Sequence, residues 1–164
     1  MEIVELTADR FEPEHRHQFE AVSPSGPHVV IQGSIRTFPS GPPPNGALRG
    51  NEDDDEENEF DVRILVGPFW KDVQSVVPKV TIDGFVSFNP DEDDALKWEI
   101  RELEWDTIGE LGASNDELRI RLKFRVIVRG EHSWITRLGY HVMARGRRLG
   151  DGGLNTPGPV KTQG

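Results

Sequence analysis

Cysteine is absent from this 164-residue chain, which excludes a disulfide-stapled scaffold and any chemistry that needs a thiol. Long apolar runs are also lacking: none approaches membrane-spanning length, and the first residues show no basic segment followed by an apolar one. These absences predict a soluble chain without a membrane span, either cytoplasmic or secreted by an unconventional route. Helical periodicity of useful length is missing too, so strands are expected to supply the core.

Alternation with a period of two is the main pattern that is present, together with 17 glycines and 12 prolines. Between Glu117 and Arg129 apolar residues alternate with basic ones, which predicts a strand with one buried and one cationic face. The segment Trp134–Met143 alternates again. Because Gly130-Glu131-His132-Ser133 supply turn chemistry between them, we expect a long antiparallel hairpin, covered by a second sheet.

Four further strands are predicted upstream, and together they favour a small all-β, six-stranded antiparallel β-sandwich, with three strands in each sheet. We expect a bulge at Gly33, a bulge or a close approach of another chain segment at Gly84, and either a bulge or a change of the buried face between Ile100 and Leu103. The expected strands cover residues 28–38, 59–66, 76–88 and 95–107.

The chain is expected to hold one domain. Residues 1–27 read as an N-terminal arm, 28–146 as the β-sandwich domain, and 147–164 as a disordered C-terminal tail. Within the domain, residues 40–58 combine a proline-rich stretch with an acidic block and predict a long mobile loop.

The formal net charge of −10 argues against broad binding to nucleic-acid phosphates. The basic row on the strand from Leu118 nevertheless leaves three interpretations open. It could contact nucleic acid beside Trp98 and Trp105, form a subunit interface, or make cross-strand ion pairs with acids of the preceding strand. The row comprises Arg119, Arg121, Lys123 and Arg125, and the acids are Glu99, Glu102 and Glu104.

Signals for catalysis and cofactors are weak. No Gly-x-Ser-x-Gly pattern occurs, and the acidic blocks lie in loops where carboxylates titrate normally. The pair His15 and His17 lacks a third metal ligand. Oxygen ligands at 89, 91, 93 and 94 suit calcium, but a solubilising hairpin tip explains them as well. We therefore predict a protein that is not an enzyme and has no cofactor.

The turn before the last strand resembles a binding site most. Glu131, His132 and Trp134 join a carboxylate, an imidazole and an indole at the tip of a rigid element. Aromatic faces with a few directed hydrogen bonds are what a protein needs to hold a sugar. Trp134 is equally well explained as a core residue at the start of its strand.

From the first predicted strand onward, the order of features resembles the H-type lectins, the agglutinin domain of snail and slime-mould proteins. The similarity covers roughly residues 29 to 146. The segments that carry it are Ile31–Ile35, Phe60–Ile64 with Pro68-Phe69, Pro78–Phe85, Phe124–Val128 and Ile135–Ala144.

The resemblance implies a sandwich that assembles as a homotrimer or a dimer of trimers, and that binds N-acetylgalactosamine or galactose at the subunit edges. The residues it places there are Asp54 in the acidic loop, Lys97 where the family has an arginine, and His132 and Trp134 in the last turn. We therefore expect a multivalent carbohydrate-binding protein that does not bind nucleic acid. The alternative is an oligomeric β-sandwich interaction module that binds no sugar.

Overall fold

The computed structural model describes residues 1–7, 17–23, 26–37, 48–50, 56–87, 96–109, 118–130 and 132–148. Of these residues 91% lie in strands and none in a helix, which confirms the predicted all-β class. This described part contains no helix with the length and apolar character needed to cross a membrane. The predicted tail lies outside it from residue 149 onward.

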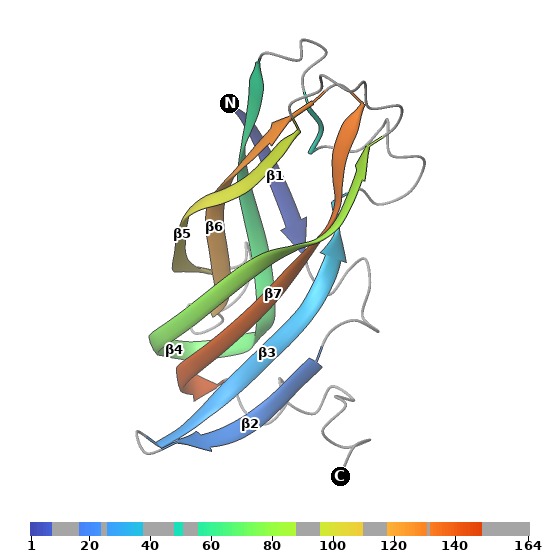
Figure 1. Ribbon diagram of the computed structural model, residues 1–164. Helices are drawn as coiled ribbons and strands as arrows, with labels where there is room; N and C mark the ends of the chain where they lie inside the picture. The colour runs from blue at the N-terminus through green and yellow to red at the C-terminus, as the bar shows by residue number, and fades with distance from the viewer. Residues whose placement is uncertain are drawn as a thin grey trace.

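Among the described residues, seven strands hydrogen-bond into one sheet (Figure 1). The order is β2-β3-β7-β4-β6-β5, and β1 pairs in parallel with β4. The sequence analysis predicted neither β1 nor β2, which fall within the expected N-terminal arm. The bounds are β1 Glu2–Thr7, β2 His17–Ser23, β3 Gly26–Arg36, β4 Glu57–Ser87, β5 Lys97–Gly109, β6 Leu118–Arg129 and β7 Ser133–Arg148.

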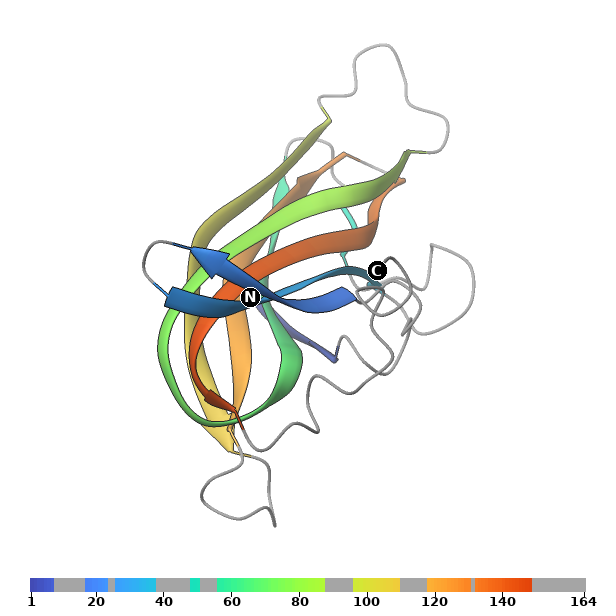
Figure 2. The same cartoon turned by 90° about the horizontal axis from the view of Figure 1, so that it is seen from below.

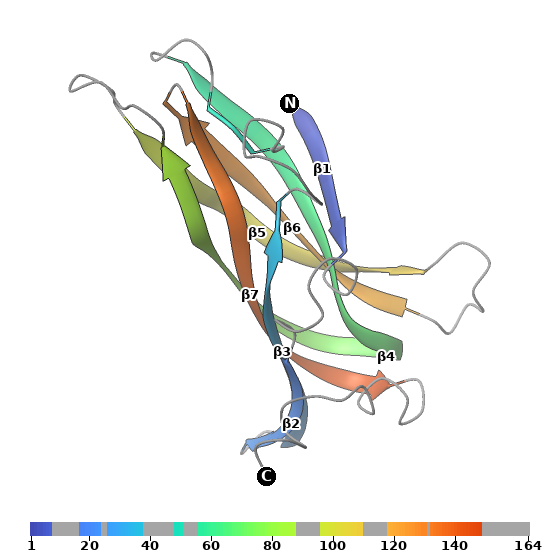
Figure 3. The ribbon, with the colours of Figure 1, turned by 90° about the vertical axis from the view of Figure 1, so that its right-hand side faces the viewer.

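The long strand β4 organises the sheet because it changes partners midway. Its residues up to Val66 pair with β6, its residues from Asp72 pair with β7, and Trp70 pairs with both. The change falls at Gly67-Pro68, where the sequence predicted that one strand would end. The strand instead continues through a bend (Figure 3). Two predicted strands are therefore one.

This exchange divides the sheet into two halves. The first half consists of β1, the N-terminal part of β4, β6 and β5. The second half consists of the C-terminal part of β4, β7, β3 and β2. Because β6 takes one edge of β4 at residues 60–65, β1 pairs along the other edge, which β7 does not reach.

The predicted hairpin is wrong in its pairing. β6 lies between β4 and β5, whereas β7 lies between β3 and β4, so the two strands are not ladder partners. The turn between them is present, since Gly130 and His132 have positive φ angles of 118° and 59°. The turn connects the two halves of the sheet, because β6 pairs with the N-terminal part of β4 and β7 pairs with its C-terminal part.

The two halves curl around one hydrophobic core (Figure 2). The inward positions of β6 are buried, as the alternation predicted, and they share the core with Ile31 of β3 and with Leu138 and Val142 of β7. The second half thus provides the cover that the apolar face of β6 requires. The finer prediction of six strands in two separate sheets is not confirmed, because the described strands form one continuous sheet.

Two of the three predicted bulges are confirmed. The register of β5 against β6 shifts between Arg101 and Glu104, and Glu102 has a φ of 56°. The register of β4 against β7 shifts on both sides of Gly84. At Gly33 the prediction is wrong, because β3 pairs with β7 without interruption.

Candidate functional site

The residues predicted to bind sugar come together only in part. Trp134 is buried, with 8% of its surface exposed, because the segment 48–50 pairs over the start of β7. The backbone N–H of Ile135 donates to Leu48 O at 2.9 Å, and that of Gly50 donates to Ser133 O at 2.8 Å. The indole is therefore buried, as the core alternative expects, although it lies outside the main hydrophobic cluster.

His132 is the exposed member of this turn, and its ring centroid lies 6.5 Å from that of Trp134. Lys97 lies on β5, where its Nζ is 2.7 Å from Glu57 Oε1 and 3.6 Å from Glu99 Oε2. Its charge is thus neutralised within the protein. Asp54 and Glu131 lie outside the described residues, as do the candidate calcium loop 89–94 and His15.

The outer face of the first half is covered by cross-strand ion pairs. Arg121 donates to both carboxylate oxygens of Asp106, at 2.8 and 2.6 Å. Lys123 lies 3.0 Å from Glu104, and Arg125 lies 3.3 Å from Glu102. Two of the three acids predicted to pair with the cationic row are confirmed as its partners.

Glu99, the third predicted acid, instead pairs on its own strand with Arg101 at 2.7 Å. On β4, Arg63 lies 3.0 Å from Asp61 and 3.7 Å from Glu5 of β1. Acid and base therefore neutralise each other over this face. Such half-exposed pairs contribute little stability individually, but they use up the charge that binding a polyanion would need.

The electrostatics of the face follow from these contacts. The hydrogen bond from Arg121, more than its charge, lowers the pKa of Asp106 below the usual value for an aspartate, although partial burial opposes the shift. The same hydrogen bond raises the pKa of Arg121. The bond to Glu104 is the largest cause that raises the pKa of Lys123.

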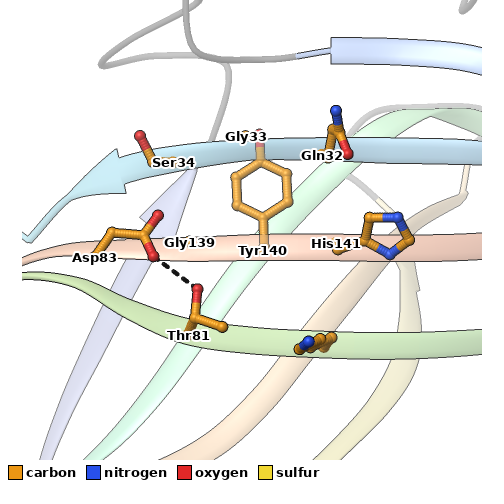
Figure 4. Close-up of a pocket in the computed structure, with 9 residues that line it drawn as sticks. Gln32, Gly33, Ser34, Thr81, Asp83, Gly139, Tyr140 and His141 are labelled. Carbon is orange, nitrogen blue, oxygen red and sulfur yellow. Dashed lines mark hydrogen bonds between the residues drawn. The ribbon is translucent and has the colours of Figure 1, made fainter.

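The second half has a different outer face, with a hollow of about 550 Å³ centred on Gly139 of β7 (Figure 4). The sheet register explains its position. Gly139 pairs with Ser34 of β3 on one side and with Thr81 of β4 on the other, and the neighbouring outward position of β7 is His141. The absence of a side chain at Gly139 leaves room for Asp83 and Thr81 to lean over the central strand, among the polar groups that line the hollow. The Gly139 hollow is lined by Gln32, Gly33, Ser34, Lys79, Thr81, Asp83, Gly139, Tyr140 and His141.

Asp83 and Thr81 lie above the bare backbone of Gly139. The Thr81 hydroxyl donates to Asp83 Oδ1 at 2.7 Å (Figure 4). A Cβ added to Gly139 would meet Asp83 Oδ2 and would lie 2.6 Å from Thr81 Oγ1. Any side chain at position 139 would therefore displace this pair, so the hollow requires glycine.

Several hydrogen-bonding groups of the hollow make no contact within the protein. In the part of the chain that the structure describes, the side chains of Gln32, Lys79 and His141 form no hydrogen bond or ion pair. Ser34 accepts a hydrogen bond of 3.1 Å from Arg137, at one end of the hollow. The hollow thus offers an amide, an imidazole, an ammonium group, hydroxyls and a carboxylate to a ligand.

Chemically, this set can hold a polar molecule by directed hydrogen bonds. Tyr140 is 4% exposed and belongs to the core cluster, so it offers little aromatic surface for stacking. Among the described residues no group of three or more histidine, aspartate or glutamate side chains could hold a metal ion. The arrangement is suited to recognition of hydroxyl groups.

The hollow was not predicted from the sequence, although two of the segments that form it had been identified. Both Pro78–Phe85 and Ile135–Ala144 carry the lectin resemblance, yet neither was assigned a site. The alternation does place Thr81, Asp83 and Gly139 on outward positions. What it cannot supply is the register that brings Gly139 between Ser34 and Thr81, because those pairings join residues far apart in the chain.

Comparison with known proteins adds no family assignment. No family model matches the chain, and the searches of curated proteins and of solved structures found no match either.

Proposed function

We propose that this protein is a non-enzymatic carbohydrate-binding protein, and that its sugar site is the Gly139 hollow. The observation that carries the proposal is the set of uncommitted side chains at the hollow: Gln32, Lys79 and His141 have no partner in the described part of the chain. The outer face of the first half, by contrast, is covered by ion pairs.

A saccharide suits the chemistry of the hollow. Its adjacent hydroxyl groups both donate and accept, so they can pair with the carboxylate of Asp83, the amide of Gln32 and the hydroxyl of Thr81. The hollow is open and polar, and a site of this kind holds its ligand weakly and through water. Useful avidity then requires several copies, which agrees with the oligomer expected from the lectin resemblance.

Galactose and N-acetylgalactosamine are the first ligands to test, because the resemblance implies them. The proposal moves the site, however, from the subunit edges and the last turn to the face of the sheet. Trp134 supports this move, since a buried indole presents little surface to a sugar.

The test is a glycan-array screen of the purified protein, with Asp83→Asn as the site variant and Asp72→Asn as the matched control. Asp72 lies on the same strand and pairs with Arg147 at 2.6 Å, away from the hollow. We expect terminal galactose-type glycans to bind, and the Asp83 variant alone to lose binding. Binding that survives Asp83→Asn but fails in His132→Ala would return the site to the last turn.

One observation favours the alternative function, an interaction module without sugar binding. Trp98 of β5 is 46% exposed, and its ring stacks on Phe85 of β4 with centroids 4.2 Å apart. Leu96 beside it is 36% exposed. Exposed aromatic groups of this kind anchor protein interfaces. The alternative predicts an oligomer in light scattering that Trp98→Ser converts to monomer, with no glycan bound by either form.

A further inference from the structure

The outward positions of β3, of β4 from Val77 to Asp83 and of β7 up to Arg145 carry more cations than carboxylates, although the chain as a whole carries a net charge of −10. Outward positions alternate along β3, along β7 and along β4 from Val77 to Asp83. In these described segments, Asp83 is the single outward carboxylate. The outward cations are Arg36, Lys79, Arg137 and Arg145.

Within the Gly139 hollow the positive charge is concentrated at one end. Lys79 and His141 are direct partners in the ladder between β4 and β7. Side chains at paired positions of adjacent strands have Cβ atoms roughly 5 Å apart. The ammonium group and the imidazole can therefore donate to the same ligand group.

Asp83 forms no ion pair with Lys79 in the part of the chain that the structure describes. It lies four residues along β4 from Lys79, which at about 3.3 Å per residue places their Cα atoms about 13 Å apart. Asp83 also accepts the hydrogen bond from Thr81, on the side of the hollow next to Gly139.

The absence of a carboxylate beside Lys79 among the described residues does not follow from a shortage of acidic residues in the chain. Asp and Glu number 29 against 19 Lys and Arg. On the first half, Arg121, Lys123 and Arg125 each have a carboxylate partner from a neighbouring strand. An acid-rich chain that leaves Lys79 beside His141 without a carboxylate has a position suited to an anion from outside.

We propose that the ligand of the Gly139 hollow is an acidic saccharide, with its carboxylate or sulfate group held by Lys79 and His141 and its hydroxyls facing Asp83 and Thr81. This inference rests on the proposed function, and it specifies the class of sugar. The two ends of the hollow then differ in chemistry. One end is cationic and holds the acid group, and the other end offers hydrogen-bond acceptors to the hydroxyls.

The experiment compares three sugars with one ring stereochemistry by calorimetric titration of the full chain: methyl β-galactoside, galacturonic acid and galactose 6-sulfate. Charge-assisted hydrogen bonds are stronger than neutral ones, so we expect an acidic sugar to bind about tenfold more tightly than the neutral one. Lys79→Gln should remove that preference, so that the acidic sugars and methyl β-galactoside bind the variant with similar affinities. Lys71→Gln, an exposed lysine of the same strand outside the hollow, is the matched control.

Three results would contradict the inference, and the third would also contradict the proposed function. Equal affinities for all three sugars overturn the acidic ligand and leave the proposed function standing. A preference for acidic sugars that survives Lys79→Gln also overturns it. Binding of inorganic sulfate as tight as that of galactose 6-sulfate, without any binding of methyl β-galactoside, overturns both.

Discussion

At the scale of single residues, Gly139 shows how a side chain that is absent can create a site. The strands on either side bring Ser34 and Thr81 next to bare backbone, and Asp83 reaches over it. No positive φ is involved at this position, so glycine is required by the space that the neighbouring side chains occupy and not by the backbone conformation.

This argument gives the first prediction. Gly139→Ala should weaken binding of a galactose-type sugar, because the added methyl group displaces the Asp83 carboxylate and the Thr81 hydroxyl. The free energy of unfolding should change by no more than about 1 kcal/mol, because the displacement of these two side chains opposes the entropic gain of replacing a glycine inside a strand. Calorimetric titration and urea unfolding of the same variant measure both effects. A variant that binds as well as the parent would exclude Asp83 and Thr81 from the site.

The two tryptophans Trp134 and Trp98 differ in environment, which yields the second prediction. Trp134→Ala should reduce the free energy of unfolding by about 3–5 kcal/mol, because it leaves a cavity beside the core. Trp98→Ala should cost only about 1 kcal/mol, the worth of its stacking on Phe85, because the indole is nearly half exposed. Urea unfolding of the two variants measures both losses. Equal losses in the free energy of unfolding would contradict the difference in burial between the two tryptophans.

At the scale of elements, β4 determines the arrangement of the sheet. A 31-residue strand that pairs first with β6 and then with β7 makes one sheet turn over its own apolar face. The ion pairs of Arg121, Lys123 and Arg125 belong to this scale as well, since each of them joins neighbouring strands and depends on the register between them.

The pair of Arg121 and Asp106 gives a prediction about pH. The pKa of Asp106 is lowered in the folded protein by the hydrogen bond from Arg121. Its contribution to stability is thus fully present above the unfolded value of about 3.9, and is lost as pH falls through the lower folded value. Asp106→Asn should be less stable than the parent at pH 7, and the difference should shrink below about pH 4. Urea unfolding at both pH values measures it; a constant difference would contradict the ion pair.

A further prediction concerns β1, a six-residue strand on the free edge of β4. Its Val4 and Leu6 are buried in the core, and burial of such side chains contributes about 1.5–3 kcal/mol each. Deleting residues 1–7 should therefore reduce the free energy of unfolding by several kcal/mol. The deletion also exposes the edge of β4, so light scattering should detect aggregation. A deletion that leaves stability and solubility unchanged would exclude β1 from the fold.

How much of this could be predicted depends on whether the signal is local. The alternation of β6, the bulge near Glu102 and the bulge at Gly84 could be predicted, because each is a change of period or a glycine within one segment. The partner of β6 could not be predicted, because alternation fixes which face is buried and says nothing about the neighbouring strand. The sequence suggested a hairpin with β7, and only the bend of β4 reveals the true order.

For the candidate site as well, only features encoded by residues close together in the sequence could be predicted. His132 and Trp134 were predicted because they are neighbours in sequence, and the structure buries Trp134 under the segment 48–50. The Gly139 hollow gathers residues from three strands whose register no local pattern encodes. Ion pairs of Glu102 and Glu104 with the basic row were one of three interpretations that the sequence left open, and the structure shows them because those acids lie on the preceding strand.

At the scale of the whole molecule, the two halves carry different charge on their outer faces. Cations on the outer face of the first half have carboxylate partners, whereas Lys79 in the hollow of the second half has none among the described residues. Since the halves share one core, neither half is expected to fold alone. Unfolding in urea, followed by tryptophan fluorescence and by circular dichroism, should give coincident single transitions. Two separated transitions would contradict a common core.

The central claim is that the Gly139 hollow binds a saccharide, and it is tested most directly by amide chemical-shift mapping of the ¹⁵N-labelled protein during titration with galactose 6-sulfate and methyl β-galactoside. We predict that the shifting amides cluster on three adjacent strands, at Gln32 and Ser34, at Thr81 and Asp83, and at Gly139 and His141. Shifts confined to the His132 turn, or no shifts at millimolar concentrations of either sugar, would contradict it.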